Sequence, residues 1–140
     1  MQESDGAKFH KDLKMHPHGI TVQKGINNNI DSYSAFFDNG KLAQTELHAK
    51  LKERRVTDVF VCGIATDICV SYTANDAQDL GYRTILIQDA CGGIQAKDIL
   101  ATKNNIKVKH GLVVNSTDVK DLVRGTNCPF ELGYAQALKL

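Results

Sequence analysis

The sequence predicts an α/β protein built on a parallel β-sheet with helices packed on both faces. Short runs of apolar and β-branched residues, typical of buried strands, recur along the chain and alternate with segments of helical periodicity. Strands that alternate with helices form βαβ units, whose strands run parallel. In such sheets ligands bind beyond the carboxyl ends of the strands, so residues that directly follow a strand are candidates for a functional site.

The N-terminal half of the chain predicts one strand, one loop and one helix. Ile20–Gln23 is a short β-branched run, which indicates a strand that ends at Lys24. Residues 25–31 contain a glycine and three consecutive asparagines, which favour a loop. Three leucines then recur at helical spacing and predict a helix that ends at Arg54 or Arg55: Leu42, Leu47 and Leu51.

The C-terminal half predicts three more strands, each followed by a helix. Asp58–Cys62 is apolar at nearly every position, as expected of a buried strand in a parallel sheet. The next helix is expected from Thr66 to Leu80, with Thr66 or Asp67 as its N-cap and Gly81 at its end. The same patterns predict the remaining elements: a strand at Arg83–Gln88, a loop at Asp89–Gly93, a helix from about Gln95 to Asn104, a strand at Leu112–Val114, a short helix from Thr117 or Asp118, and a further helix toward Leu140.

Composition narrows the classes of function. The 140 residues make one domain or part of one, and the 42% hydrophobic and 24% charged fractions are those of an ordinary globular protein. The net charge is +1, the basic residues are scattered and Trp is absent, so neither nucleic acid nor an anionic membrane is an expected partner. No apolar run approaches the roughly 18–20 residues that cross a bilayer, and the first six residues lack the apolar core of a secretory signal.

The four cysteines form no C-x-x-C pair and fit no zinc spacing. Cys62 falls inside a predicted strand and is expected to be a small buried residue. Free cysteines are typical of reducing compartments, so an intracellular, cytoplasmic location is expected.

Cys69 is the sharpest candidate for a catalytic residue. It lies in the first turn of the helix that follows the strand at Asp58–Cys62. A helix N-terminus carries partial positive charge and free N–H groups, which favour the thiolate that attacks a carbonyl carbon. The small residues of Gly63–Thr66 allow backbone N–H groups to approach a substrate oxygen, as in an oxyanion hole. On the residues alone, a buried helical cysteine and an ordinary strand-to-helix turn stay open as alternatives.

Other candidates follow from position and side-chain type. Lys24 ends a predicted strand and could pair with a thiolate or be a solvated surface lysine. Tyr33, Phe36 and Phe37 could wall an aromatic pocket or belong to the core. The histidines show no metal-ligand spacing and are expected at the surface: His10, His16, His18, His48 and His110.

Taken together, these stretches resemble the nicotinamidases of the isochorismatase-like cysteine hydrolase family. Gly63–Val70, with the sequence GIATDICV, is similar to the family's nucleophile motif. Val22–Gly25 resembles the segment with the catalytic lysine, and Asp31–Phe36 resembles a segment that lines the pyridine pocket. Ser4–His10 looks like the stretch shortly before the lysine strand, and the similarity reaches to about residue 122.

The resemblance implies a role for each matching residue. Cys69 would be the nucleophile and Lys24 the catalytic lysine, the N–H groups of Ala65 and Cys69 would form the oxyanion hole, and the Ile64–Ala65 peptide bond would be cis. The substrate pocket would include Tyr33, Phe36 and Ile64. The implied reaction is hydrolysis of nicotinamide to nicotinate and ammonia through a cysteine thioester, in NAD salvage. The full-length enzyme would use a divalent metal, zinc, and a homo-oligomer stays open.

The chain departs from the family's pattern in its catalytic aspartate, its metal ligands and its strands. It has no Asp-x-Gln-x-Asp-Phe segment, which would carry the aspartate, and no complete metal site. In the family's strand order 3-2-1-4-5-6, Ile20–Gln23 would be the third strand and Asp58–Cys62 the fourth, with the first two strands absent. Residues 1–140 are therefore expected to be the C-terminal portion of a single domain, with an incomplete doubly wound sheet.

Such a portion is expected to be poorly soluble or molten, and inactive, on its own, because the strand at Asp58–Cys62 would be left as an exposed apolar edge. Two other functions stay open. The enzyme could act on another small amide, or the chain could be an inactive truncated form that serves as an interaction module.

Overall fold

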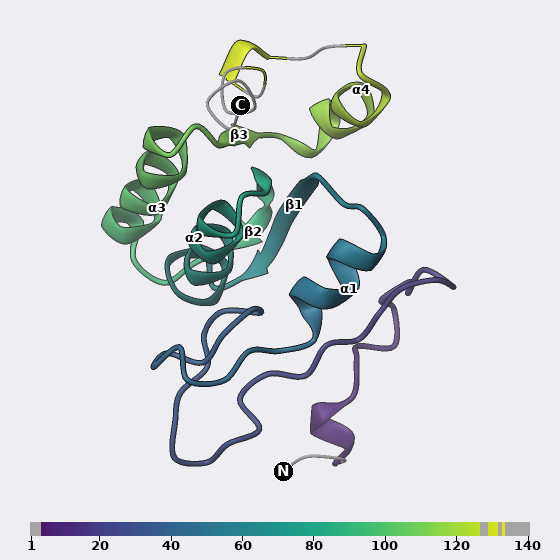
Figure 1. Ribbon diagram of the computed structural model, residues 1–140, viewed down its shortest axis with the longest axis vertical. Coiled ribbons are helices and arrows are strands. Elements are labelled where there is room, and N and C mark those ends of the chain that lie inside the picture. The colour runs from purple at the N-terminus through teal and green to yellow at the C-terminus, as the bar shows by residue number, and fades with distance from the viewer. Residues whose placement is uncertain (1–3, 127–128, 132, 134–140) are drawn as a thin grey trace.

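A computed structural model describes residues 4–126, 129–131 and 133. Its centre is a parallel sheet of three strands in the order β1-β2-β3 (Figure 1). The strands are β1 (Asp58–Ile64), β2 (Arg83–Gly92) and β3 (Leu112–Val114). The α-helices are α1 (Leu47–Glu53), α2 (Ser71–Asp79), α3 (Ala96–Val108) and α4 (Val119–Arg124). Three short turns complete the elements: the 3-10 turns η1 (Asp5–Ala7) and η3 (Ser116–Asp118), and the π-helical turn η2 (Thr66–Val70).

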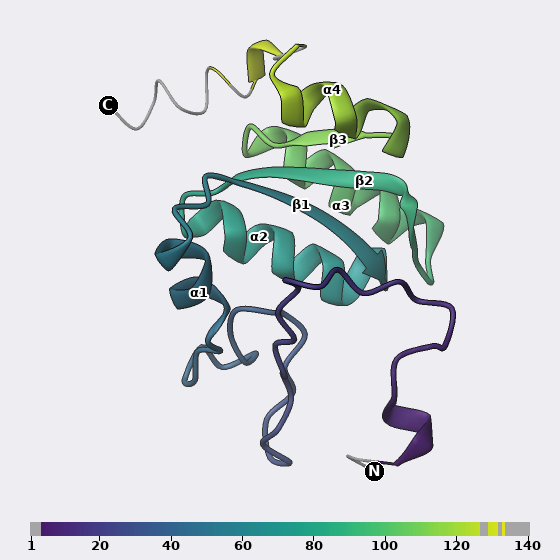
Figure 2. The same cartoon turned by 90° about the vertical axis from the view of Figure 1, so that its right-hand side faces the viewer.

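Helices α2 and α3 cover the same face of the sheet, as Figure 2 shows. The main core lies between them and the strands. Its buried residues come from η2, α2, β2 and α3: Val70, Ala74, Leu86 and Ile106. Because Val70 directly follows Cys69, this core sits immediately beneath the turn that carries the candidate nucleophile.

A second core cluster joins the N-terminal half of the chain to α2. Phe36 packs on Ala77 and on Tyr82, whose ring is stacked at 6.1 Å from that of Phe36. Leu47 and Leu51 of α1 pack against the same cluster. The segment before α1 is thereby held against α2, although it contains almost no regular secondary structure.

The ladder between β1 and β2 changes register near the carboxyl end of β1. Val61 pairs with Leu86, but Gly63 pairs with Cys91 and Ile64 with Gly92. β2 therefore arches away from β1 and returns to it at Cys91. This return brings the end of β2 beside the turn that follows β1.

The three C-terminal strands are confirmed, while several predicted boundaries are wrong. Ile20–Gln23 has no regular secondary structure and is not a strand, because in the described part of the chain no strand lies beyond β1 to supply a ladder partner. The first helix begins at Leu47, and Leu42 lies outside it with 80% of its surface exposed. β2 extends through Gly92 and includes most of the segment predicted to be a loop.

Three further differences concern the C-terminal half. Cys62 is exposed rather than buried, because β1 alternates and this side chain points away from the face that α2 covers. The predicted helix from Thr66 begins as the π-helical turn η2, and α3 continues to Val108. The expected helix toward Leu140 lies mostly outside the described residues, of which residues 130, 131 and 133 are helical. Among those that are described, no helix is both long and apolar enough to span a bilayer.

Candidate active site

Cys69 lies in the turn that follows the carboxyl end of β1. The peptide bond between Ile64 and Ala65 is cis, and Gly63 has a φ of +122°, a backbone conformation that favours glycine. The chain then winds into η2, in which the Val70 N–H donates to the Ala65 carbonyl at 3.0 Å. Cys69 is therefore in the first turn of the helix and is half-buried. Ala65 and Cys69 are the residues expected to supply oxyanion-hole N–H groups, and both belong to this turn.

Lys24 reaches Cys69 across 45 positions of sequence. Its Nζ donates to the Cys69 Sγ at 3.4 Å, to the Ser32 carbonyl at 2.7 Å and to the Tyr33 carbonyl at 2.9 Å. These three acceptors match the three donors of an ammonium group. The two carbonyl groups fix the position of the ammonium group. Its third N–H is then directed at the Cys69 sulfur, where the positive charge can stabilise a thiolate.

The aromatic residues divide between the site and the core. Tyr33 is half-buried, and its ring meets that of Tyr72 edge-on with centroids 5.2 Å apart. Phe36, expected in the substrate pocket, is 2% exposed and belongs to the second core cluster, where it stacks on Tyr82. Ile64, the third expected pocket residue, ends β1 with 81% of its surface exposed.

Asp67 has a role that differs from the predicted helix cap. Its carboxylate accepts the N–H of Gln95 at 2.8 Å and the N–H of Ile94 at 3.1 Å, both from the loop before α3. The Gln95 N–H, and to a lesser degree that of Ile94, holds the pKa of the Asp67 carboxyl below its ordinary value of 3.8. A cap prediction considers only the residue's own helix, so the pattern gave no signal of this link to a distant loop.

The described residues do not assemble a metal site. They contain no group of three His, Cys, Asp or Glu side chains arranged to hold an ion. His10, His16 and His18 are exposed, as predicted. His48 is half-buried rather than at the surface, because its Nδ1 lies 2.9 Å from the Tyr82 hydroxyl.

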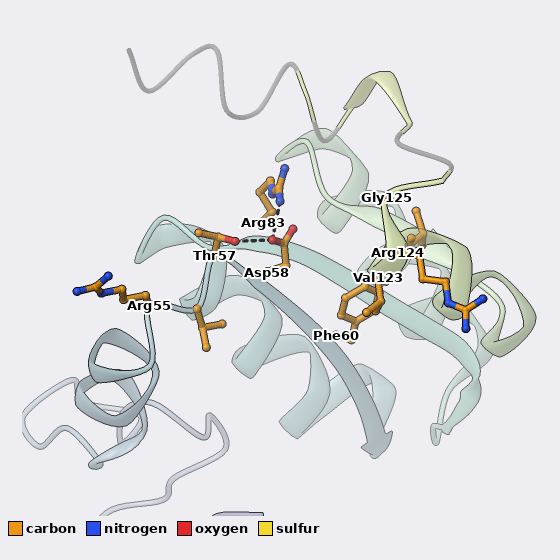
Figure 3. Close-up of a pocket in the computed structure, with 10 residues that line it drawn as sticks. Arg55, Thr57, Asp58, Phe60, Arg83, Val123, Arg124 and Gly125 are labelled. Atoms are coloured by element: carbon orange, nitrogen blue, oxygen red, sulfur yellow. Dashed lines mark hydrogen bonds and ion pairs between the residues drawn. The ribbon is translucent and has the colours of Figure 1, made fainter.

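A hollow of about 570 Å³ lies near the amino end of β1, the end opposite Cys69 (Figure 3). Asp58 at its centre accepts hydrogen bonds from Arg83 at 2.5 Å and from the Thr57 hydroxyl at 2.6 Å. Arg55 and Arg124 extend in opposite directions at its two sides. Its charged groups do not converge on a common point, so the Lys24–Cys69 pair is the better candidate for the site.

Comparison with known proteins gives a consistent picture. The model of the family described as "Isochorismatase domain" matches residues 1–118. The nicotinamidase of Escherichia coli K12 is 42% identical over 94 residues, which cover 67% of this chain and 44% of that protein. The chain therefore spans less than half the length of this relative.

Two solved structures are similar to the fold. The nicotinamidase/pyrazinamidase of Acinetobacter baumanii gives a TM-score of 0.79 at 38% identity, over 84% of this chain and 57% of that one. The Pyrococcus horikoshii pyrazinamidase, solved in complex with zinc, gives a TM-score of 0.70 at 30% identity, over 81% of this chain and 59% of that one.

Proposed function

The chain belongs to the isochorismatase family, and from this we propose that the protein containing it is an amide hydrolase with Cys69 as its nucleophile. The observation that carries the proposal is the 3.4 Å contact between the Lys24 ammonium and the Cys69 sulfur. A cysteine that only fills space in the core needs no lysine beside its sulfur. Here the lysine is also held in place, because its other two N–H groups donate to backbone carbonyls. An ammonium held against a thiol at the start of a helix stabilises the negative sulfur that an acyl-transfer reaction needs.

The reaction follows from these groups. Cys69 transfers its proton to a carboxylate, which the family resemblance assigns to an aspartate outside this chain. Its sulfur attacks the amide carbon, and the N–H groups of Ala65 and Cys69 stabilise the oxyanion of the tetrahedral adduct. The adduct expels the amide nitrogen, which takes up a proton and leaves as ammonia. Water then cleaves the Cys69 thioester, which releases the carboxylic acid and restores the thiol.

Nicotinamide is the substrate we propose, with nicotinate and ammonia as products. The similarity to proteins named nicotinamidase supports this choice. Tyr33 and Ile64 would contact the ring of the substrate, while Phe36 supports the segment of Tyr33 from the core. The reaction would serve NAD salvage. A divalent metal such as the zinc of the Pyrococcus horikoshii structure would need ligands outside the described residues, so no step here depends on it.

We also propose that residues 1–140 form the C-terminal portion of one hydrolase domain. Two observations support this: the chain spans less than half of its relative's length, and among the described residues no strand pairs with the outer edge of β1. The same edge favours a second candidate function, an interaction module that binds another protein there. Addition of the rest of the domain as a separate chain distinguishes the two, because recovered ammonia release supports the enzyme and binding without activity supports the module.

The decisive experiment measures ammonia release from nicotinamide by the intact protein. Cys69→Ala should lower the rate at least about 10³-fold, since it removes the attacking atom, and Lys24→Met should also lower it. Cys62→Ala is the matched control, because this exposed thiol on β1 has no role in the proposed chemistry and its loss should leave the rate unchanged. Retained turnover in Cys69→Ala would reject the mechanism. A panel of other small amides tests the choice of substrate.

A further inference from the structure

The turn with Cys69 is attached to the loop before α3 by a side chain that the reaction does not use. Asp67 lies two positions before Cys69, and its carboxylate accepts the N–H groups of Ile94 and Gln95. Gln95 is the residue immediately before α3, and Ile94 precedes it. Asp67 therefore accepts, from another element, the N–H groups of the last two residues of this loop.

These hydrogen bonds extend the pairing between β1 and β2 beyond the strands. The ladder ends at Ile64 paired with Gly92, and Asp67 continues the connection to Ile94 and Gln95. The nucleophile turn is thus docked along one continuous stretch of chain that follows β2. On its other side the same turn meets the Lys24 ammonium through Cys69.

The loop is shaped to admit this carboxylate. A Cβ on Gly93 would lie 2.9 Å from the Asp67 Oδ1, and 2.6 and 2.7 Å from two carbons of Ile99. A side chain at position 93 would therefore push the carboxylate away from the loop. This steric requirement is an observation independent of the hydrogen bonds, and it indicates the same close contact.

We propose that Asp67 is a positioning residue for the nucleophile: by fixing the turn on the loop before α3, it keeps the Cys69 sulfur within reach of the Lys24 ammonium. This inference rests on the proposed function of Cys69. A residue that only stabilised α3 would leave the interaction between the sulfur and the ammonium unchanged, which makes that interaction the quantity to measure.

The test follows alkylation of Cys69 by iodoacetamide at neutral pH in the intact protein, with mass spectrometry that resolves Cys69 from the other cysteines. In the otherwise unchanged protein, Lys24→Met should slow alkylation of Cys69 on the order of tenfold, because the thiolate loses its charged hydrogen bond. In an Asp67→Asn background the same change should have an effect of about twofold or less, since the sulfur is no longer held against the lysine.

Asp98→Asn is the matched control, because it removes an exposed acidic charge from the first turn of α3 and leaves in place the backbone N–H that Asp98 donates to the Gln95 carbonyl at 3.0 Å. In that background the tenfold effect of Lys24→Met should remain. Gly93→Ala is a second probe that leaves every charge in place and should reduce the effect of Lys24→Met as Asp67→Asn does.

The outcomes separate this inference from the proposed function. An undiminished effect of Lys24→Met in both Asp67→Asn and Gly93→Ala overturns the role of Asp67 and leaves the Lys24–Cys69 pair standing. No effect of Lys24→Met in any background overturns the pair and the inference together. Loss of the far-UV circular dichroism spectrum in both Asp67→Asn and Gly93→Ala would assign Asp67 to folding and also overturn the inference.

Discussion

Gly111→Ala should strongly destabilise the protein, because there is no space for one additional methyl group where α3 leads into β3. Gly111 is buried, and a Cβ there would lie 2.7 Å from three atoms: the Gln78 Nε2, the Ile106 Cγ2 and the Thr84 carbonyl oxygen. Thr84 and Ile106 are at most 1% exposed, so neither can move without disturbing the core.

The Gln78 amide is the group with most freedom to move, but its movement also has a cost. Its Nε2 donates to the Ile106 carbonyl at 3.0 Å and to the Lys109 carbonyl at 3.3 Å, and these bonds close the end of α3. Overpacking a core costs about 1–3 kcal/mol and each lost hydrogen bond about 0.5–1.5 kcal/mol. We therefore expect a loss of about 2–6 kcal/mol in the free energy of unfolding, a large part of the 5–15 kcal/mol typical of a domain.

Urea unfolding of the intact protein measures this loss. Gly6→Ala is the matched control, because a Cβ there meets only the Ser4 Oγ at 4.0 Å and should change stability by less than about 0.5 kcal/mol. If Gly111→Ala unfolds within about 0.5 kcal/mol of the unchanged protein, the close approach of these three atoms does not limit packing at this position and the reasoning is refuted.

Three other predictions concern pH, thiol reactivity and the isolated chain. The Ser116 hydroxyl and N–H, which donate to the Asp89 carboxylate, hold its pKa below the ordinary value of 3.8. The charged carboxylate therefore stabilises the fold above pH 3.8, and this contribution is lost as the pH falls through the lower pKa of the folded state. Asp89→Asn should weaken the fall in melting temperature with pH in the acid range, and an unchanged fall would contradict a stabilising contact between Asp89 and Ser116. Burial raises the pKa of the Cys91 thiol while Cys62 is exposed, so iodoacetamide at pH 8 should label Cys62 first in a peptide-resolved time course, and the reverse order would disprove this. The isolated 140-residue chain should bind the dye ANS and melt without a cooperative transition, because no strand among the described residues pairs with the outer edge of β1; a sharp calorimetric peak would show that this edge needs no partner.

The strands and helices after residue 57 were predictable because their patterns are local. Asp58–Ile64 and Leu112–Val114 are apolar runs between helical segments, and each forms a strand wherever the sheet supplies a neighbour. Ile20–Gln23 has the same β-branched character but is not a strand. Pairing is a property of two segments, so one segment's composition cannot establish it.

The sequence predicted candidate residues for the site, but not the hydrogen bonds that link the site to other elements. The expectation that residues directly after strands are candidates for the site agrees with the contact between Lys24 and Cys69, although Lys24 follows a segment without regular secondary structure and not a strand. The link from Asp67 to Ile94 and Gln95 depends on the register change between β1 and β2, which no spacing in the sequence encodes. Phe36 is aromatic and adjacent to the site in sequence, but tertiary packing directs it into the core.

The arch of β2 gives this molecule a place where its dimensions can change during evolution. Between the pairs Val61–Leu86 and Gly63–Cys91, β1 advances two positions while β2 advances five. The extra residues all lie in β2, and the Asp89 carboxylate among them accepts hydrogen bonds from the N–H and hydroxyl of Ser116. Insertion or deletion of a residue in this part of β2 would move Cys91 and the chain after it relative to the nucleophile. The pairs from Asp58–Arg83 to Val61–Leu86 would keep their register.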